Sequence, residues 1–138
     1  MQYFKLFSVF SVSLMLFCFI SKAHAQSSPV LYFCESYGTY GEVSISDRFN
    51  TGYLTVMVKC DHEIGLRDVS VQYDKYDPRT GVFNYSKKFN FTVQPSQKYI
   101  YFERSSTNDM SFDSPGFYRV FLLDENGKTV TSSLIEII

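Results

Sequence analysis

The sequence is poor in the residue types on which common catalytic and metal sites depend. It has no tryptophan, two histidines and three cysteines in 138 residues, and His62 is the only histidine after residue 25. No serine lies in a Gly-x-Ser-x-Gly context, the nucleophile motif of α/β-hydrolases. No pair of carboxylates stands out from the others as a candidate for glycoside hydrolysis. We therefore expect a protein that is not an enzyme and that carries no cofactor.

The sequence also lacks any stretch of ten or more residues with a clean helical period. Aromatic side chains are abundant, since nine of the 14 Phe and ten of the 11 Tyr lie after residue 25. With Val, Ile and Thr, these residues favour strands. Turn residues interrupt an apolar–polar alternation every eight to twelve positions, which is typical of an all-β domain.

An excess of charge of one sign is absent as well. The chain has 13 basic and 14 acidic side chains, and without Lys5 and Lys22 of the first 25 residues its formal charge changes from −1 to −3. Nucleic-acid binding needs a basic face, and an anionic membrane surface attracts polybasic segments. We expect neither partner.

Residues 1–25 have the three parts of a cleaved signal peptide. Lys5 supplies the positive charge, residues 6–20 are uncharged and apolar, and Ala23 and Ala25 form the small-x-small pattern before a cut at Ala25–Gln26. The apolar run is shorter than the roughly 20 residues that span a bilayer. Cleavage is favoured over a retained anchor. The sequence predicts a secreted or periplasmic protein without a membrane span.

The remaining residues, 26–138, have the size of one domain. We expect strands near residues 30–35, 42–46, 53–60, 68–73, 83–93, 99–103, 117–124 and 128–138. Turns are expected at 77–81, where Pro78 and Gly81 occur, and at Asn126-Gly127, a strong two-residue hairpin signal. Seven or eight short strands with this spacing predict an antiparallel β-sandwich or a small barrel.

Two cysteines, Cys34 and Cys60, remain after residue 25. A pair of cysteines in a small exported domain predicts a disulfide, and the alternation of residues 53–60 directs Cys60 inward. The alternative, a site with two metal-binding thiolates, needs further ligands, and Cys60-Asp61-His62-Glu63 is the only compact group of them. Acidic residues at the turns lack the spacing of a calcium site. We expect the disulfide and no metal.

Residues 113–120, Asp-Ser-Pro-Gly-Phe-Tyr-Arg-Val, resemble the approach to the penultimate strand of immunoglobulin-like domains. In those domains a Gly-x-Tyr motif places a tyrosine corner, whose hydroxyl bonds to upstream backbone. The resemblance implies that Tyr118 is this corner residue. Val120 occupies the position of the second core cysteine, so the chain is similar to bacterial extracytoplasmic immunoglobulin-like modules and differs from antibody domains.

The same C-terminal segment is also similar to the sorting domains of the type IX secretion system of Bacteroidota. It shares Pro-Gly-x-Tyr, Asn-Gly-Lys and a final apolar strand with them. Those domains usually end with a basic residue after the last strand, whereas this chain ends Leu-Ile-Glu-Ile-Ile.

The segment 73–85 alternates aromatic rings with charges around a predicted turn. A hairpin tip rich in Tyr and Arg suits a protein-binding patch or a glycan platform. The competing interpretation directs Tyr73, Phe83 and Tyr85 into the core. We select Tyr76 and Arg79 as candidate binding residues, and Tyr37 and Tyr40 extend the surface if their loop lies at the same end.

The sequence thus predicts an exported immunoglobulin-like module that recognises another protein in the periplasm or at the cell surface. A glycan is the alternative ligand. Two other functions remain open, a structural subunit of a surface assembly that uses strand exchange, and a small secreted inhibitor or accessory of a hydrolase. The sequence does not indicate the oligomeric state.

Overall fold

The computed structural model describes residues 29–138, and within this range the chain forms strands and connecting loops without any helix. The expected signal peptide, residues 1–25, lies outside the described residues. The domain expected at residues 26–138 is therefore described from residue 29 onward, and its all-β character is confirmed.

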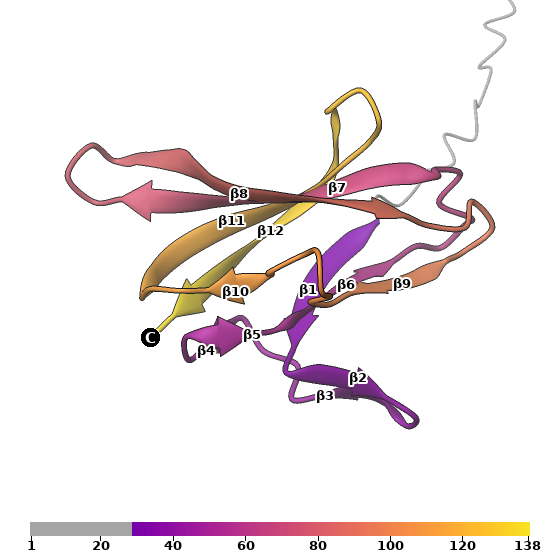
Figure 1. Cartoon of the computed structure of the whole chain (residues 1–138), viewed down its shortest axis with the longest axis horizontal. Coiled ribbons are helices and arrows are strands. Elements are labelled where there is room, and N and C mark those ends of the chain that lie inside the picture. The colour runs from indigo at the N-terminus through magenta and orange to yellow at the C-terminus, as the bar shows by residue number, and fades with distance from the viewer. Residues whose placement is uncertain (1–28) are drawn as a thin grey trace, which may run out of the picture.

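Twelve strands make two principal layers (Figure 1). One layer is a three-stranded sheet of β1 (Val30–Cys34), β6 (Thr55–Lys59) and β9 (Tyr99–Phe102). The other is a five-stranded sheet in the order β4 (Arg48–Phe49), β12 (Thr129–Ile137), β11 (Gly116–Leu123), β7 (Asp68–Asp77) and β8 (Val82–Thr92). Two small pairs complete the fold, β2 (Ser36–Gly38) with β3 (Gly41–Val43), and β5 (Gly52–Tyr53) with β10 (Ser111–Phe112).

The strand order confirms an immunoglobulin-like β-sandwich. In that fold, the first, second, fourth and fifth strands form one sheet, and the third, sixth and seventh form the other, which variable-type domains extend by two strands added after the third. Here β1, β6 and β9 form the first sheet, and β12, β11, β7 and the added β8 form the second. Neighbouring strands are antiparallel except for β4, which runs parallel to β12.

Valines and aromatic rings fill the core between the sheets, where antibody domains have a disulfide packed against a tryptophan. Val120 on β11 and Val56 on β6 are completely buried. Tyr73 of β7 lies opposite Val120, and its ring stacks on Phe112 with 4.4 Å between centroids. The ring of Tyr118 meets Phe112 edge-on at 5.1 Å. Offset and edge-to-face ring pairs stabilise a core beyond the burial of their apolar area.

The β7–β8 hairpin is longer than the sequence suggested and projects beyond the rest of its sheet (Figure 1). Its turn forms as expected at residues 77–81. The side chain of Asp77 accepts a hydrogen bond from the backbone N–H of Arg79 at 2.9 Å, and its carbonyl oxygen accepts one from Gly81 at 2.8 Å. Gly81 has φ of 71°, a conformation that glycine adopts without steric cost.

A β-bulge divides β8 into two parts. Tyr73 pairs with Lys87, but the next residue of β7, Asp74, pairs with Tyr85, so Ser86 is the extra residue. Cross-strand partners in an antiparallel pair share a face of the sheet. The bulge therefore reverses the alternation of β8, because Phe89 and Lys87 lie on the same side as the buried Tyr73, while Tyr85 lies on the opposite side with Asp74.

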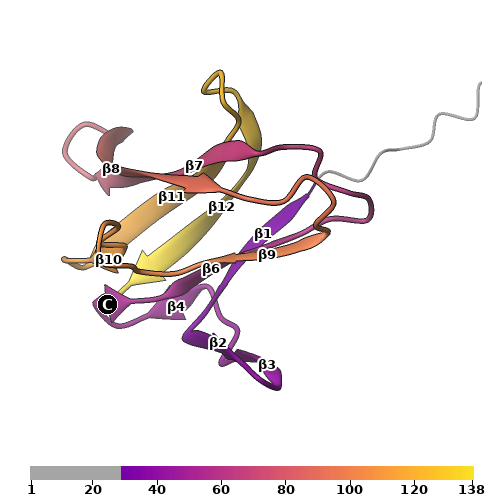
Figure 2. The same cartoon turned by 45° about the vertical axis from the view of Figure 1, so that its right-hand side comes forward.

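The segment expected to be a loop at residues 37–41, followed by an edge strand at 42–46, is a short hairpin of β2 and β3. Tyr37 pairs with Glu42, and the turn lies between Gly38 and Gly41. In both views this hairpin lies on the side of the three-stranded sheet that faces away from the larger sheet (Figure 1, Figure 2). It is thus far from the tip of the β7–β8 hairpin.

The disulfide expected between Cys34 and Cys60 is not formed, and both cysteines are free and buried. Cys34 pairs with Thr55, five residues before Cys60 on the adjacent strand. At about 3.3 Å per residue, this places the two cysteines roughly 16 Å apart, whereas a disulfide needs Cα atoms within about 7 Å. Sequence parity indicated that Cys60 points inward, but parity does not determine the distance along a strand.

Candidate functional site

Tyr118 has the geometry that the resemblance to immunoglobulin-like domains implies for a corner tyrosine. Its ring is buried, and its hydroxyl donates a hydrogen bond of 2.8 Å to the carbonyl oxygen of Ser114, four residues upstream. The ammonium of Lys75 bonds the Ser114 hydroxyl at 2.6 Å and lies 5.5 Å from the centre of the Tyr118 ring. Tyr118 therefore anchors the start of β11, which is a role in the fold.

The aromatic residues between the bulge and the tip of the β7–β8 hairpin lie on the outer face of the five-stranded sheet. Tyr76 pairs with Phe83, and their ring centroids are 5.3 Å apart. Tyr85, two residues from Phe83 on the same face, is 66% exposed. The interpretation that placed Tyr73, Phe83 and Tyr85 in the core holds for Tyr73 alone, because the bulge at Ser86 turns the other two outward.

Residues of β11 and β12 extend this face toward the middle of the sheet. The guanidinium of Arg119 lies over the Phe83 ring, 4.7 Å from its centroid, and the register places Arg119 between Asp74 and Leu134. Phe117, two residues before Arg119, is 51% exposed. We call this surface the aromatic platform, and it consists of Tyr76, Phe83, Tyr85, Phe117, Arg119 and Leu134.

Arg79, the second residue selected from the hairpin, lies at its exposed tip, and none of its contacts is with a platform ring. Its guanidinium Nε is 3.4 Å from a carboxylate oxygen of Asp77, two residues earlier in the same turn. The Arg79 side chain is 88% exposed, and an exposed ion pair of this kind contributes little to stability. The arginine that the structure brings to the rings is Arg119, which sequence reasoning did not select.

Tyr37 and Tyr40 belong to a different surface, on the outer side of the three-stranded sheet. Tyr37 stacks on Tyr101 of β9 with centroids 4.6 Å apart and meets Tyr99 edge-on at 5.7 Å. Tyr40 is fully exposed at the tip of the β2–β3 hairpin. We call this surface the tyrosine face, and it consists of Tyr32, Tyr37, Tyr40, Glu42, Tyr99 and Tyr101. These residues do not extend the platform.

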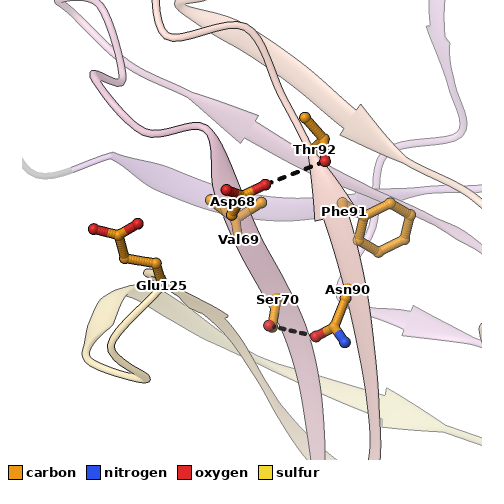
Figure 3. A pocket seen from close by; sticks show the side chains of 7 residues that line it. All are labelled: Asp68, Val69, Ser70, Asn90, Phe91, Thr92 and Glu125. Carbon is orange, nitrogen blue, oxygen red and sulfur yellow. Dashed lines mark hydrogen bonds between the residues drawn. The ribbon is translucent and has the colours of Figure 1, made fainter.

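A shallow depression of about 290 Å³ lies where β7 and β8 approach the β11–β12 turn (Figure 3). Asp68 and Ser70 line it from β7, Asn90 and Thr92 from β8, and Glu125 from the turn. Hydrogen bonds between the strands engage its polar side chains, from Ser70 to Asn90 at 2.8 Å and from Thr92 to Asp68 at 3.3 Å. These groups satisfy one another across the hairpin.

Residues 29–138 bring together no group of three or more His, Cys, Asp or Glu side chains able to hold a metal ion. In Cys60-Asp61-His62-Glu63, the cysteine is buried, and the three residues after it are exposed. Burial raises the pKa of the Cys60 thiol, which favours the protonated form over a metal-binding thiolate. In the same part of the chain, no helix is long and apolar enough to cross a membrane.

Sequence reasoning missed five of the six platform residues, Phe83, Tyr85, Phe117, Arg119 and Leu134. The aromatic pattern of residues 83–93 continues on odd positions through Ser86, so it gives no sign that a bulge reverses the faces. For Arg119, a signal exists in its position between Tyr118 and Val120, both of which face the core. Strand alternation places Arg119 on the outer face.

No protein-family model matches this chain, and the search of curated proteins finds no match. Among solved structures, the chain is similar to an immunoglobulin-like protein from Pseudomonas aeruginosa, with a TM-score of 0.49 and 8% sequence identity. The match covers 83% of this chain and 99% of that protein.

Proposed function

We propose that this chain is an exported, non-enzymatic immunoglobulin-like module that recognises another protein through the aromatic platform. One observation carries the proposal, the outward presentation of the Tyr76, Phe83 and Tyr85 rings by a β-bulge, with Arg119 over Phe83. Bulges commonly re-aim side chains at positions of function. Export rests on the signal-peptide pattern of residues 1–25.

The residue types of the platform are those that dominate protein–protein interfaces. Tyr and Arg are enriched among the residues whose truncation to alanine weakens binding by about 2 kcal/mol or more. The Tyr76–Phe83 contact and the Arg119–Phe83 contact hold three of these side chains before a partner arrives. A pre-ordered surface loses less conformational entropy on binding than a mobile one.

The platform also avoids the features of a small-molecule pocket. At its edge, the platform residues Phe117 and Leu134 line a depression of about 220 Å³. Arg48 and Glu136 also line it and form an ion pair at 3.1 Å. Ligand pockets for drug-sized molecules usually enclose 300–1,000 Å³, as an order of magnitude. A broad, exposed aromatic surface beside a shallow depression fits a macromolecular partner better.

The proposal is tested by capture of a partner from the native cell envelope with immobilised mature protein. We expect wild-type protein to retain a partner that the double variant Tyr76→Ala/Tyr85→Ala loses. The matched control is Tyr53→Ala, which removes an exposed tyrosine that belongs to neither the platform nor the tyrosine face. If the platform variant retains the partner with wild-type affinity, the platform is not the recognition surface.

A second candidate function is that of a surface-assembly subunit that accepts a strand from a neighbouring copy. The unpaired edges of the two sheets favour it. Among the described strands, β8 pairs with β7 alone and β9 with β6 alone, so each layer has a free edge on this side. A groove of about 350 Å³ lies between these edges, lined by Phe91, Ile100 and Phe102 among others. An unpaired strand edge is a template for a further strand.

This candidate predicts concentration-dependent oligomers of the mature protein in light scattering. Phe91→Glu places a charge in the groove and should abolish them, whereas Tyr85→Ala should not. A protein that remains monomeric over the whole concentration range argues against strand exchange between copies and leaves the platform proposal untouched.

A further inference from the structure

The tyrosine face is a second aromatic surface on the side of the three-stranded sheet where the β2–β3 hairpin lies (Figure 2). The hairpin contributes to it through the contacts of Tyr37 with Tyr99 and Tyr101. Tyr32 and Tyr101 lie on either side of Met57 in the register of β1, β6 and β9. Met57 is completely buried although it points to the outer side of its sheet, because the hairpin and the rings cover it. The rings therefore have a supported, fixed arrangement.

Glu42 of β3 joins the rings to each other. The hydroxyl of Tyr32 donates a hydrogen bond to a carboxylate oxygen of Glu42 and lies 3.4 Å from the hydroxyl of Tyr99. Hydrogen bonds from Tyr32 and from Tyr99 hold the pKa of Glu42 below its ordinary value. Burial, followed by the contacts with Glu42 and Tyr99, raises the pKa of Tyr32. Glu42 therefore remains a carboxylate among neutral tyrosines.

A second carboxylate, that of Glu103, lies close to the same face. Glu103 comes two residues after Tyr101, which faces outward with Met57, so strand alternation directs Glu103 to the same face. Burial raises the pKa of the Cys34 thiol, and the charges of Glu42 and Glu103 raise it further, which agrees with this placement. The cation of Lys59 is also within electrostatic range of Glu42. The two carboxylates exceed this cation, which gives the face a negative potential.

Two tyrosines of the tyrosine face are open to solvent. Tyr40 is fully exposed at the hairpin tip, and Tyr101 is 46% exposed beside Tyr37. Val43 at the end of β3 and Ile45 just after the hairpin are also exposed and add apolar area. Contiguous exposed apolar area rimmed by polar groups marks interaction sites on soluble proteins.

We propose that the tyrosine face binds an arginine-bearing segment of a partner protein, with guanidinium groups against the Tyr40 and Tyr101 rings and beside the Glu42 carboxylate. A guanidinium stacks on aromatic faces and forms paired hydrogen bonds with carboxylates. Glu42 accepts hydrogen bonds from Tyr32 and Tyr99, and a carboxylate with about four lone-pair sites has capacity left for a further donor. The inference concerns a surface separate from the platform and does not depend on it.

Charge complementarity decides between this occupant and others. Carboxylates at 42 and 103 repel the phosphates of nucleic acids and the acidic headgroups of lipids. A lysine segment satisfies the carboxylates, but its compact, strongly hydrated ammonium gains less from stacking than a guanidinium does. The expected preference is therefore for arginine over lysine.

The test is isothermal titration of the mature protein with hexa-arginine and hexa-lysine peptides at low ionic strength. We expect hexa-arginine to bind more tightly than hexa-lysine. Tyr40→Ala should weaken hexa-arginine binding about two- to fivefold, as a cation–π contact of ~0.5–1 kcal/mol implies. Glu42→Gln, which keeps the side-chain size and removes the charge, should weaken it as well.

Two controls keep the result interpretable. Glu125→Gln removes a carboxylate of the β11–β12 turn and should leave hexa-arginine affinity unchanged, and so should the platform variant Tyr85→Ala. Circular dichroism establishes that each variant is folded. Equal affinity for both peptides, or Tyr40→Ala and Glu42→Gln variants that bind like wild type, overturns the proposal.

Discussion

The two parts of β8 on either side of Ser86 have similar sequences and opposite surroundings. Before the bulge, Phe83 and Tyr85 lie on the outer face, with Tyr85 mostly exposed and Arg119 over Phe83. After it, Phe89 lies on the inner face and contacts the Tyr73 ring edge-on at 5.5 Å. One inserted residue thus divides a continuous aromatic pattern into a part that stabilises the core and a part available to a partner.

The comparison predicts that aromatic substitutions differ in effect according to the face they occupy. Rings on the inner face are buried in a close-packed core, so their truncation leaves a cavity and destabilises the fold. Rings on the outer face remove little area from water until a partner covers them, so their loss should affect binding instead of folding.

The largest expected effect is that of Tyr73→Ala. Its ring is buried between Phe89 and Phe112, and its hydroxyl donates a hydrogen bond of 3.3 Å to the carbonyl oxygen of Met110. Truncation of a buried aromatic side chain costs about 3–5 kcal/mol of unfolding free energy. Urea denaturation measures it, with Tyr85→Ala as the matched outer-face control expected within about 0.5 kcal/mol of wild type. Equal losses in both variants contradict the assignment of faces.

A smaller loss is expected for Tyr118→Phe, which keeps the buried ring and removes the hydroxyl. The hydrogen bond to the Ser114 carbonyl oxygen disappears, and the free energy of unfolding should fall by about 1–2 kcal/mol. Urea denaturation again measures the change. A Tyr118→Phe variant as stable as wild type shows that this hydroxyl does not anchor β11.

The smallest effect concerns Lys87, which the bulge turns toward the core side. Its ammonium bonds the carbonyl oxygen of Ser111 at 3.0 Å and forms an ion pair with Asp113 at 2.5 Å. The Lys87 contact, followed by that of Ser111, lowers the pKa of Asp113. Because the folded pKa is lowered, the carboxylate stabilises the fold above about pH 3.9, its ordinary pKa, and this stability is lost as the pH falls through the lowered value.

Asp113→Asn should therefore reduce stability by about 0.5 kcal/mol at pH 7, a small amount because the Asp113 side chain is 62% exposed. The difference between variant and wild type should vanish near pH 2, where both side chains are uncharged. Urea denaturation at the two pH values measures it. A difference that persists unchanged at pH 2 shows that the ion pair is not its cause.

Most of the fold could be predicted from the sequence, and the limits have physical causes. Alternation and turn residues located the principal strands, and the motif at residues 113–120 indicated an immunoglobulin-like sandwich, because those signals are local. The pairing of Cys34 with Thr55 depends on the register of two strands, which neither strand reveals alone. The disulfide prediction was wrong for this reason.

The candidate surfaces were predictable only in part for the same reason. Tyr76 was selected correctly as a ring outside the core, because its parity on β7 continues from residues that alternate clearly. Tyr85 required knowledge of the bulge, and the separation of Tyr37 from the hairpin required knowledge of the folded arrangement. Arg119 joins Phe83 from a strand more than thirty residues later, a contact that only tertiary structure establishes.

Hydroxyl-radical footprinting of the mature protein, free and bound to its captured partner, tests the central claim most directly. In the free protein, we predict that Tyr85 and Phe117 are modified readily while Tyr73 and Phe89 are protected. In the complex, modification of Tyr85 and Phe117 should fall several-fold, while that of Tyr53, which belongs to neither aromatic surface, remains unchanged. Protection of Tyr85 in the free protein, or a complex that leaves both platform rings fully reactive, contradicts the account.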